Sequence, residues 1–197
     1  FALPAAGGSS VACVADAVLP VAPSVTDNCG NAITASAPVI STDPSCGGIK
    51  TYTFTYTNCD GSTLDWIYTY TIAAPTYSLP AAGSATVDCI ADVVAPVVPT
   101  ITDNCGTVLT PGAPVITGTA ACGGTITYSY PFTDCSGATQ NWIYTYTVNP
   151  PTFSLPAAGG SSVACIGDAV LPVAPSVTDN CGNAVSASAP VISTDPS

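Results

Sequence analysis

Two stretches in the first 76 residues place an aromatic or large apolar side chain at every second position. Residues 51–57 place three aromatic side chains on one side and threonines on the other. Residues 66–72 repeat this arrangement, beginning with Trp66. A period of two predicts strands with one buried face. Because a turn-rich link over residues 58–62 joins them, we predict an aromatic β-hairpin.

Shorter apolar segments surround this hairpin. Residues 9–13 and 37–41 predict two further strands, and a proline-punctuated stretch over 18–26 leads into a turn at 27–30. In the second copy of the hairpin, Pro131 predicts a bulge or a locally unpaired edge. Six or seven short strands per copy, without helical periodicity, predict an all-β fold, a small immunoglobulin-like β-sandwich.

The pattern recurs with a period of 76 residues, without insertion or deletion. The opening Phe1-Ala-Leu-Pro-Ala-Ala-Gly returns at Tyr77 and Phe153 with one changed residue after the aromatic, and all ten cysteines keep the register. Such periodicity predicts tandem modules. We predict these domains: 1–76, 77–152 and 153–197, the last being the N-terminal part of a third repeat.

The junctions between the copies are short and rich in proline. Pro75 and Pro151 precede the opening motif of the next copy, and so short a link is a poor flexible tether. We therefore expect neighbouring modules to stack end to end. The third copy resembles the first more than the second does. This A-B-A order is typical of a spacer or fibre, whose reach grows with copy number.

The composition excludes several functions. The chain has a net charge of −11 with one Lys or Arg in total and no His. It therefore lacks the cations that bind nucleic acid or an anionic membrane surface. The sequence contains no run of about 18 apolar residues, so it predicts no membrane-spanning helix. Ser and Thr are plentiful, but no histidine is present to act as their base. We predict no enzymatic activity, no catalytic residue and no cofactor.

The cysteines predict disulfide bonds. Cys46 and Cys59 bracket the aromatic strand, up to about 40 Å apart if extended, whereas disulfide-bonded Cα atoms lie within about 7 Å. In a sandwich, the first and third cysteines of a copy would lie at one end and the second and fourth at the other. We therefore predict Cys13–Cys46 and Cys29–Cys59, repeated as Cys89–Cys122 and Cys105–Cys135, with Cys165 and Cys181 opening a third set.

Four cysteines could instead bind zinc, but no Cys-x-x-Cys spacing occurs. Disulfides persist in oxidising compartments, so we predict a secreted protein, extracellular or at a cell surface. In a module of this size, which buries a modest core, they also supply stability.

Recurrent aspartates could bind Ca²⁺, which prefers six to eight oxygen ligands. The alternative is that Asp and Asn cap tight turns while Gly supplies a positive φ. We favour the turn interpretation, since two carboxylates per module are few for a tight site. The weak Ca²⁺ candidates are Asp16, Asp27, Asp92, Asp103, Asp168 and Asp179.

Two further features admit a binding role. The threonine rows could form an ice-binding face or carry O-glycans, although threonine is also an ordinary residue of an exposed strand face. Trp66 and Trp142 could stack on sugars, although one tryptophan per module in an aromatic strand more often lies in the core. We favour the structural interpretation of both features.

Four motifs together resemble the four-cysteine variety of hyalin-repeat-like modules. They are Pro-x-Val-Thr-Asp-Asn-Cys-Gly ending at Gly30, the Cys46-Gly-Gly preceding the aromatic strand, the Asn58-Cys-Asp-Gly turn, and Trp66-Ile-Tyr-Thr-Tyr-Thr. The resemblance covers nearly the whole chain. It implies an immunoglobulin-like fold and a role in adhesion or fibre building. It also implies large bacterial surface or secreted proteins, including those exported by type IX secretion.

Together these observations predict tandem immunoglobulin-like β-sandwich modules, stacked end to end and stapled by disulfides. We expect a structural segment of a long extracellular adhesin or cell-surface filament. Its expected partners are the neighbouring modules of the same chain and, by lateral self-association, other chains in a fibre. The alternative function is a repeated ligand-binding module that captures a glycan or Ca²⁺.

Overall fold

The computed structural model describes residues 1–193, and within them it is all-β apart from three single-turn 3₁₀ helices. The predicted all-β fold of disulfide-stapled repeats is confirmed. Among these residues, no helix has the length and apolar character needed to cross a membrane.

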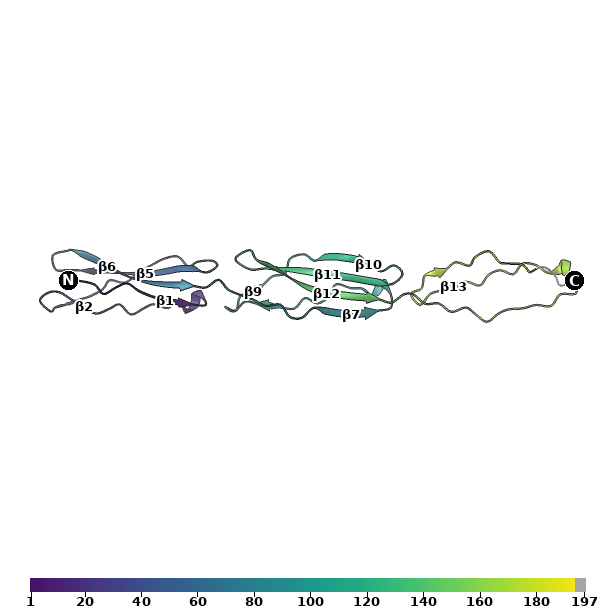
Figure 1. Ribbon diagram of the computed structural model, residues 1–197, viewed down its shortest axis with the longest axis horizontal. Helices are drawn as coiled ribbons and strands as arrows, with labels where there is room; N and C mark the ends of the chain where they lie inside the picture. Colours follow the sequence, from purple (N-terminus) through teal and green to yellow (C-terminus); the bar gives the residue numbers. More distant parts are fainter. Residues whose placement is uncertain (194–197) are drawn as a thin grey trace. The chain divides into compact units, whose positions relative to one another are not determined.

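The elements follow the 76-residue repeat (Figure 1). The first module contains β1 (Gly7–Val11), η1 (Val14–Asp16), β2 (Val25–Thr26), β3 (Ala32–Ile33), β4 (Val39–Ile40), β5 (Gly48–Thr57) and β6 (Thr63–Ile72). The second contains β7 (Gly83–Val87), η2 (Ile90–Asp92), β8 (Ile101–Thr102), β9 (Val108–Leu109), β10 (Val115–Thr119), β11 (Gly124–Thr133) and β12 (Thr139–Val148). The third contains η3 (Ile166–Asp168), β13 (Val177–Thr178) and β14 (Ala184–Val185).

The chain divides into two compact units, and the second module contributes to both. The first unit joins residues 1–81 to residues 98–114 and 130–142. Within the described residues, the second unit joins residues 82–97 to residues 115–129 and 143–193.

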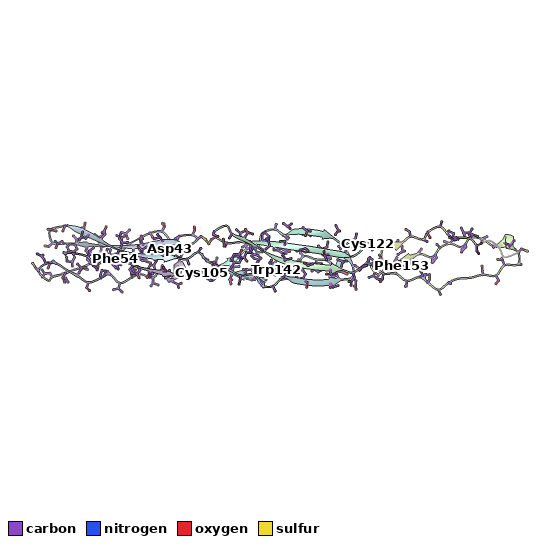
Figure 2. The ribbon with its side chains drawn as sticks, viewed as in Figure 1. Asp43, Phe54, Cys105, Cys122, Trp142 and Phe153 are labelled. Atoms are coloured by element: carbon purple, nitrogen blue, oxygen red, sulfur yellow. A yellow bond between two sulfur atoms is a disulfide. The ribbon has the colours of Figure 1, made fainter. Side chains whose placement is uncertain are left out.

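The predicted aromatic hairpin is present as β5 and β6. These strands pair antiparallel over ten residues each, with Phe54 opposite Trp66 and Thr57 opposite Thr63. Phe54 and Trp66 are 5% and 7% exposed, so the aromatic face is buried as the alternation predicts. Phe54 lies among the strands of the first module, as Trp142 does in the second (Figure 2). The tryptophans therefore belong to the core and present no sugar-stacking surface.

The first strand joins this hairpin in an unexpected direction. β1 pairs parallel with β6, giving the sheet order β1-β6-β5-β4. The second module has the equivalent order β10-β11-β12-β7. A Cβ atom on Gly7 would collide with the ring of Tyr68, so this glycine allows β1 to approach β6 closely. The polar sequence of β1 gives no apolar alternation from which this pairing could be predicted.

A second layer covers the aromatic face. It consists of the ribbon β2–β3, from which Val25 is buried, and of the proline-punctuated stretch before it. Two tyrosine side chains reach across the core and donate hydrogen bonds from their hydroxyls: Tyr52 to the carbonyl of Ala17, just before that stretch, and Tyr56 to that of Pro23 within it, both at 2.6 Å. Because an extended segment without a ladder partner needs other donors for its carbonyls, these hydroxyls hold the two layers together.

Pro131 does not interrupt its strand, since β11 has the same length as β5. At the equivalent position of the first module, the N–H of Thr55 points to the Ser36 hydroxyl, away from β6. The proline therefore lacks only a donor on the side of β11 that faces away from β12, beyond the residues that pair with β10. Its carbonyl accepts a hydrogen bond of 2.8 Å from Gly112. Because position 131 lies outside the pairing of β10 with β11, the missing N–H removes no hydrogen bond between those strands, and the proline is tolerated.

Candidate functional site at the module junctions

The Asp-Asn-Cys-Gly motif forms a tight turn closed by its own aspartate. In the first copy, Asp27 Oδ1 accepts hydrogen bonds of 2.8 Å from the backbone N–H groups of Cys29 and Asn31. Gly30 has a φ of 85°, which favours glycine. The Asn31 side chain donates to the same carboxylate at 2.9 Å and, with the backbone donors, lowers the pKa of Asp27. The turn interpretation of this motif is therefore confirmed.

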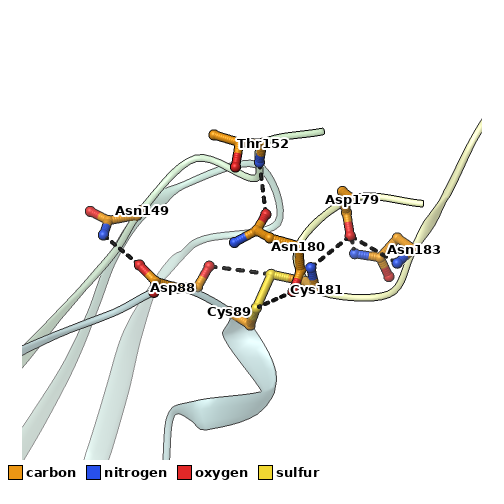
Figure 3. Close-up of a disulfide and its surroundings, with 8 residues drawn as sticks. All are labelled: Asp88, Cys89, Asn149, Thr152, Asp179, Asn180, Cys181 and Asn183. Atoms are coloured by element: carbon orange, nitrogen blue, oxygen red, sulfur yellow. Dashed lines mark hydrogen bonds between the residues drawn. A yellow bond between two sulfur atoms is a disulfide. The ribbon is translucent and has the colours of Figure 1, made fainter. Parts of the chain in front are cut away.

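The asparagine of the turn binds the peptide that links two modules. The backbone N–H of Asn104 donates to the Thr76 carbonyl at 2.9 Å, and Thr76 N–H donates to Asn104 Oδ1 at 2.7 Å. Asn180 and Thr152 form the same pair of bonds at 2.8 and 2.7 Å, and Figure 3 shows the bond to the Asn180 side chain. The turns of the second and third modules therefore each hold the linker that precedes their own module. The alternation and turn patterns do not predict this role, and its signal in the sequence is the asparagine that recurs beside the cysteine.

The cysteine of the same turn bonds to the preceding module. Cys105 is linked to Cys13 with a Cα–Cα distance of 5.6 Å, and Cys181 to Cys89 with a distance of 5.5 Å. Both bonds span 92 residues. Figure 3 shows Cys89–Cys181 beside the Asn180–Thr152 hydrogen bond. We call each such cluster, a linker with its turn and disulfide, a junction.

The first junction carries a second disulfide, Cys46–Cys135, with a Cα–Cα distance of 5.3 Å. Cys46 lies before β5, whose first residue, Gly48, pairs with Ile72 at the end of β6. Gly47 has a φ of 68°, and a Cβ there would lie 2.7 Å from the backbone nitrogen of Ala74. The glycine thus brings the turn carrying Cys46 against the end of β6, next to the linker.

The predicted disulfide pairing is wrong. Cys13–Cys46, Cys29–Cys59, Cys89–Cys122 and Cys105–Cys135 are not formed, and the three disulfides in residues 1–193 each join successive modules. Cys13 follows β1 and Cys46 precedes β5, and β6 lies between these strands. Two strand spacings of about 4.8 Å exceed the reach of a disulfide. Two cysteines at the same end of a module therefore remain too far apart to bond.

The same reasoning applies at the other end. Cys59 lies in the turn between β5 and β6, whereas Cys29 lies in the turn of the ribbon that forms the other layer. Packed β-layers are about 10 Å apart, which again exceeds disulfide reach. Six of the ten predicted disulfide cysteines are bonded. Four are exposed free thiols: Cys29, Cys59, Cys122 and Cys165.

The Ca²⁺ candidates are not brought together. Asp27, Asp103 and Asp179 each accept hydrogen bonds within their own turn. The other three candidates, Asp16, Asp92 and Asp168, end the single-turn helices, and Asp16 Oδ2 lies 3.3 Å from the N–H of Cys13. Over residues 1–193 no group of three or more Asp, Glu, Cys or His residues could hold a metal ion.

Lys50, the one basic side chain, is not available as a reactive group. Lys50 forms an ion pair of 2.7 Å with Asp43, whose carboxylate raises the Lys50 pKa. A raised pKa keeps the amine protonated and makes it a poor nucleophile or base. The second module has Ile126 in its place. The features repeated at the junctions are therefore the disulfide, the turn and the bound linker.

The comparison with protein families agrees with this repeating arrangement. The family model described as the HYR-like domain with four cysteines matches residues 1–72, 77–148 and 153–197. A search of curated proteins gave no significant match. The family is a non-catalytic structural domain type, and the disulfides suggest an extracellular or cell-surface location. The chain belongs to the family of HYR-like domains with four cysteines.

Proposed function

We propose that this chain is a structural segment of a long extracellular adhesin or cell-surface filament, in which it supplies reach and mechanical strength. The observation that carries the proposal is that its disulfides join successive modules. A small domain stabilised only for its own sake would close its disulfides internally. Bonds across a junction instead oppose the separation of modules under tension.

The stability of the junction supports the same role. Closing a loop of about 90 residues stabilises a fold by about 4–5 kcal/mol in the chain-entropy model. The bonds between Thr76 and Asn104 add a short, non-covalent contact at the linker. A linker bonded at both its N–H and C=O groups cannot swivel without breaking them. Such a junction transmits force between modules better than a free linker would.

We further propose lateral association of chains through sheet edges. Val39 and Ile40 on the edge strand β4 are 72% and 52% exposed, and Val115 and Ile116 on β10 are 61% and 56% exposed. An exposed apolar edge strand can pair with another chain. Concentration-dependent sedimentation would reveal such association, whereas monodisperse monomers at high concentration would count against it.

Electron microscopy of the full-length native protein tests the main proposal. We expect long filaments whose regular spacing matches one module. Isolated flexible beads that end in a different domain would contradict it and make the repeats a passive stalk. The bacterial origin and type IX export implied by the family resemblance are part of the proposal, and localisation on intact and secretion-deficient cells would test them.

The alternative of repeated ligand capture is tested separately. If the modules bound Ca²⁺, the melting temperature would rise with added Ca²⁺ and fall with a chelator. Because Asp27, Asp103 and Asp179 are engaged by their own turns, we expect no change in either case. A glycan array on the same protein covers the other ligand class, and we expect no specific signal.

A further inference from the structure

The three disulfides follow one rule of register. Cys13–Cys105 and Cys89–Cys181 each join the first cysteine of a module to the second cysteine of the next. Cys46–Cys135 joins the third cysteine of a module to the fourth of the next. Two junctions thus show the first type of bond at the same separation of 92 residues. A recurring separation means that the bond belongs to the repeat and not to one place in the chain.

The four free thiols are the positions that this rule leaves open. Cys29 and Cys59 are the second and fourth cysteines of the first module, so their partners would belong to a module before it. By the same rule, the partner of Cys122 is the fourth cysteine of the third module. The partner of Cys165 is the second cysteine of a fourth module. All four are exposed, as a bond to a further module requires. Their equivalents inside the chain are disulfide-bonded.

Tracing backbone and disulfides together gives two covalent paths. The first path runs from Cys29 back to Cys13, across to Cys105, back to Cys89, across to Cys181 and back to Cys165. The second path runs from Cys59 back to Cys46, across to Cys135 and back to Cys122. Each path begins and ends at a free thiol, and together they use every cysteine of the chain.

We propose that the four free thiols bond in this register to further four-cysteine modules of the same chain, so that two disulfide-linked covalent paths run continuously through the repeat array. The partner at each thiol is a module of this type placed before or after those present. The proposal rests on the register of the disulfides, and it stands whether or not the protein is an adhesin.

The mechanical consequence follows from what lies along the paths. Between Cys46 and Cys59 the backbone is β5, and between Cys122 and Cys135 it is β11. A β-strand already spans about 3.3 Å per residue, close to the limit of an extended chain. The second path is therefore nearly taut in the folded protein. Under tension, this path could lengthen very little without breaking a covalent bond, so it would bear the load before a module could unfold.

Each new bond needs an oxidant. Two thiols lose two protons and two electrons as their sulfurs join. A disulfide oxidant of the secretory environment accepts them: a thiolate attacks it, forming a mixed disulfide and releasing one thiol, and the second cysteine then attacks the mixed disulfide and releases the other thiol. Oxidised glutathione, which yields two glutathione thiols, serves as this oxidant in the test.

The test lengthens the chain by its own repeat. Residues 46–152 are appended after Ser197, which is equivalent to Ser45, so that the third module is completed and a fourth added. The extended chain carries six more cysteines. After oxidation, we expect thiol titration under denaturing conditions to find four free thiols, as in the present chain. Peptide mapping should link Cys122 to the appended copy of Cys59, and Cys165 to the appended copy of Cys105.

Two serine variants of the extended chain should change the number of free thiols in opposite directions. Cys122→Ser should raise the count by one thiol because it leaves the appended copy of Cys59 unpaired. Cys59→Ser, which removes the end of a path, should lower the count by one. The proposal is overturned if Cys122 and Cys165 stay reduced while Cys13–Cys105 forms. It is equally overturned if non-reducing electrophoresis shows that these two thiols bond between chains.

The natural protein provides a second measurement if the extended chain does not fold. The secreted protein is alkylated before denaturation and digestion, and its cysteine peptides are mapped. We expect Cys29, Cys59, Cys122 and Cys165 in disulfides to neighbouring modules. Finding them alkylated would overturn the proposal independently of any role in adhesion.

Discussion

The two junctions have one set of contacts in common, which we call the shared core of the junction, but they differ in the contacts around it. Each has a disulfide from an Asp-Asn-Cys-Gly turn and a linker bound by the asparagine of that turn. The first junction adds Cys46–Cys135. At the second junction, Cys122 is free, and the Asn149 side chain donates to Asp88 at 2.8 Å (Figure 3). The shared core is thus the minimal junction, and the other contacts modify its strength.

The hydrogen bond between the Asn149 and Asp88 side chains has no counterpart at the first junction. The residues equivalent to Asp88 and Asn149 are Ala12 and Ala73. Their backbones are nevertheless paired in the same way, since Ala73 N–H donates to the Val11 carbonyl at 3.0 Å and Asn149 N–H donates to the Val87 carbonyl at 2.9 Å. The backbone register therefore does not depend on the side-chain pair, and the comparison separates what is repeated from what is local.

Reduction of the disulfides has the largest expected effect, because it removes the covalent part of both junctions. In single-molecule stretching from end to end, the oxidised chain can extend only along about 44 residues of backbone that connect its ends through Cys13–Cys105 and Cys89–Cys181. A reductant frees the remaining backbone, about 500 Å of extra contour length. Equal contour lengths before and after reduction would contradict the disulfide assignment.

Cys46→Ser should make the first junction resemble the second. It removes the loop closed by Cys46–Cys135, so we expect up to about 4–5 kcal/mol less stability, measured by chemical unfolding. Cys122→Ser is the matched control, since this exposed cysteine has the same place in the second module but no disulfide partner in residues 1–193. Equal losses in both variants would show that the disulfide itself contributes little.

Asn104→Ala should weaken the shared core. It removes the acceptor for the Thr76 N–H, and we expect a loss of about 1 kcal/mol together with faster proteolysis at the linker. Asn28→Ala is the control, because Asn28 holds the same position in the first turn and has no linker bond in the described structure. If the two variants are cleaved at the same rate, the linker is not held by the turn.

Asp88→Ala should make the second junction resemble the first in its side chains. The Asn149 bond is exposed, so we expect a loss below about 1 kcal/mol in the melting transition. The double variant with Asn149→Ala should cost no more than Asp88→Ala alone, since both lack the same bond. Additive losses would show that the two side chains act independently.

The smallest expected effect comes from a substitution within the Asp-Asn-Cys-Gly turn of the third module. The Asn183 side chain, with backbone N–H groups, lowers the pKa of Asp179. Thr107 occupies the equivalent place in the second turn and contributes only its backbone N–H to Asp103. Asn183→Thr should therefore raise the pKa of Asp179 toward its ordinary value, as followed by NMR titration. An unchanged titration midpoint would show that the side-chain bond is absent in solution.

The direction of the pH dependence follows from this lowered pKa. A carboxylate whose folded pKa lies below its unfolded value stabilises the fold fully above the unfolded pKa of about 4. That stability is lost as the pH falls through the lowered folded value. The Asn183→Thr variant should thus lose part of its stability above pH 4 and differ less from the parent chain in stronger acid.

The sequence by itself determined the features that depend on neighbours along the chain. Alternation over residues 51–57 and 66–72 was enough for the hairpin, because a period of two leaves one face to bury. The Asp-Asn-Cys-Gly motif was enough for the turn, because the aspartate bonds to its own backbone.

The tertiary structure alone decided which cysteines bond. Strand order in the sheet places β6 between β1 and β5, and this order depends on a parallel pairing that the polar sequence of β1 does not encode by alternation. A disulfide forms only within about 7 Å, so a difference of one strand position changes the partner. Cys13 therefore bonds to Cys105, a distant residue along the chain, because sheet geometry separates it from Cys46 and the turn of the next module brings Cys105 within reach.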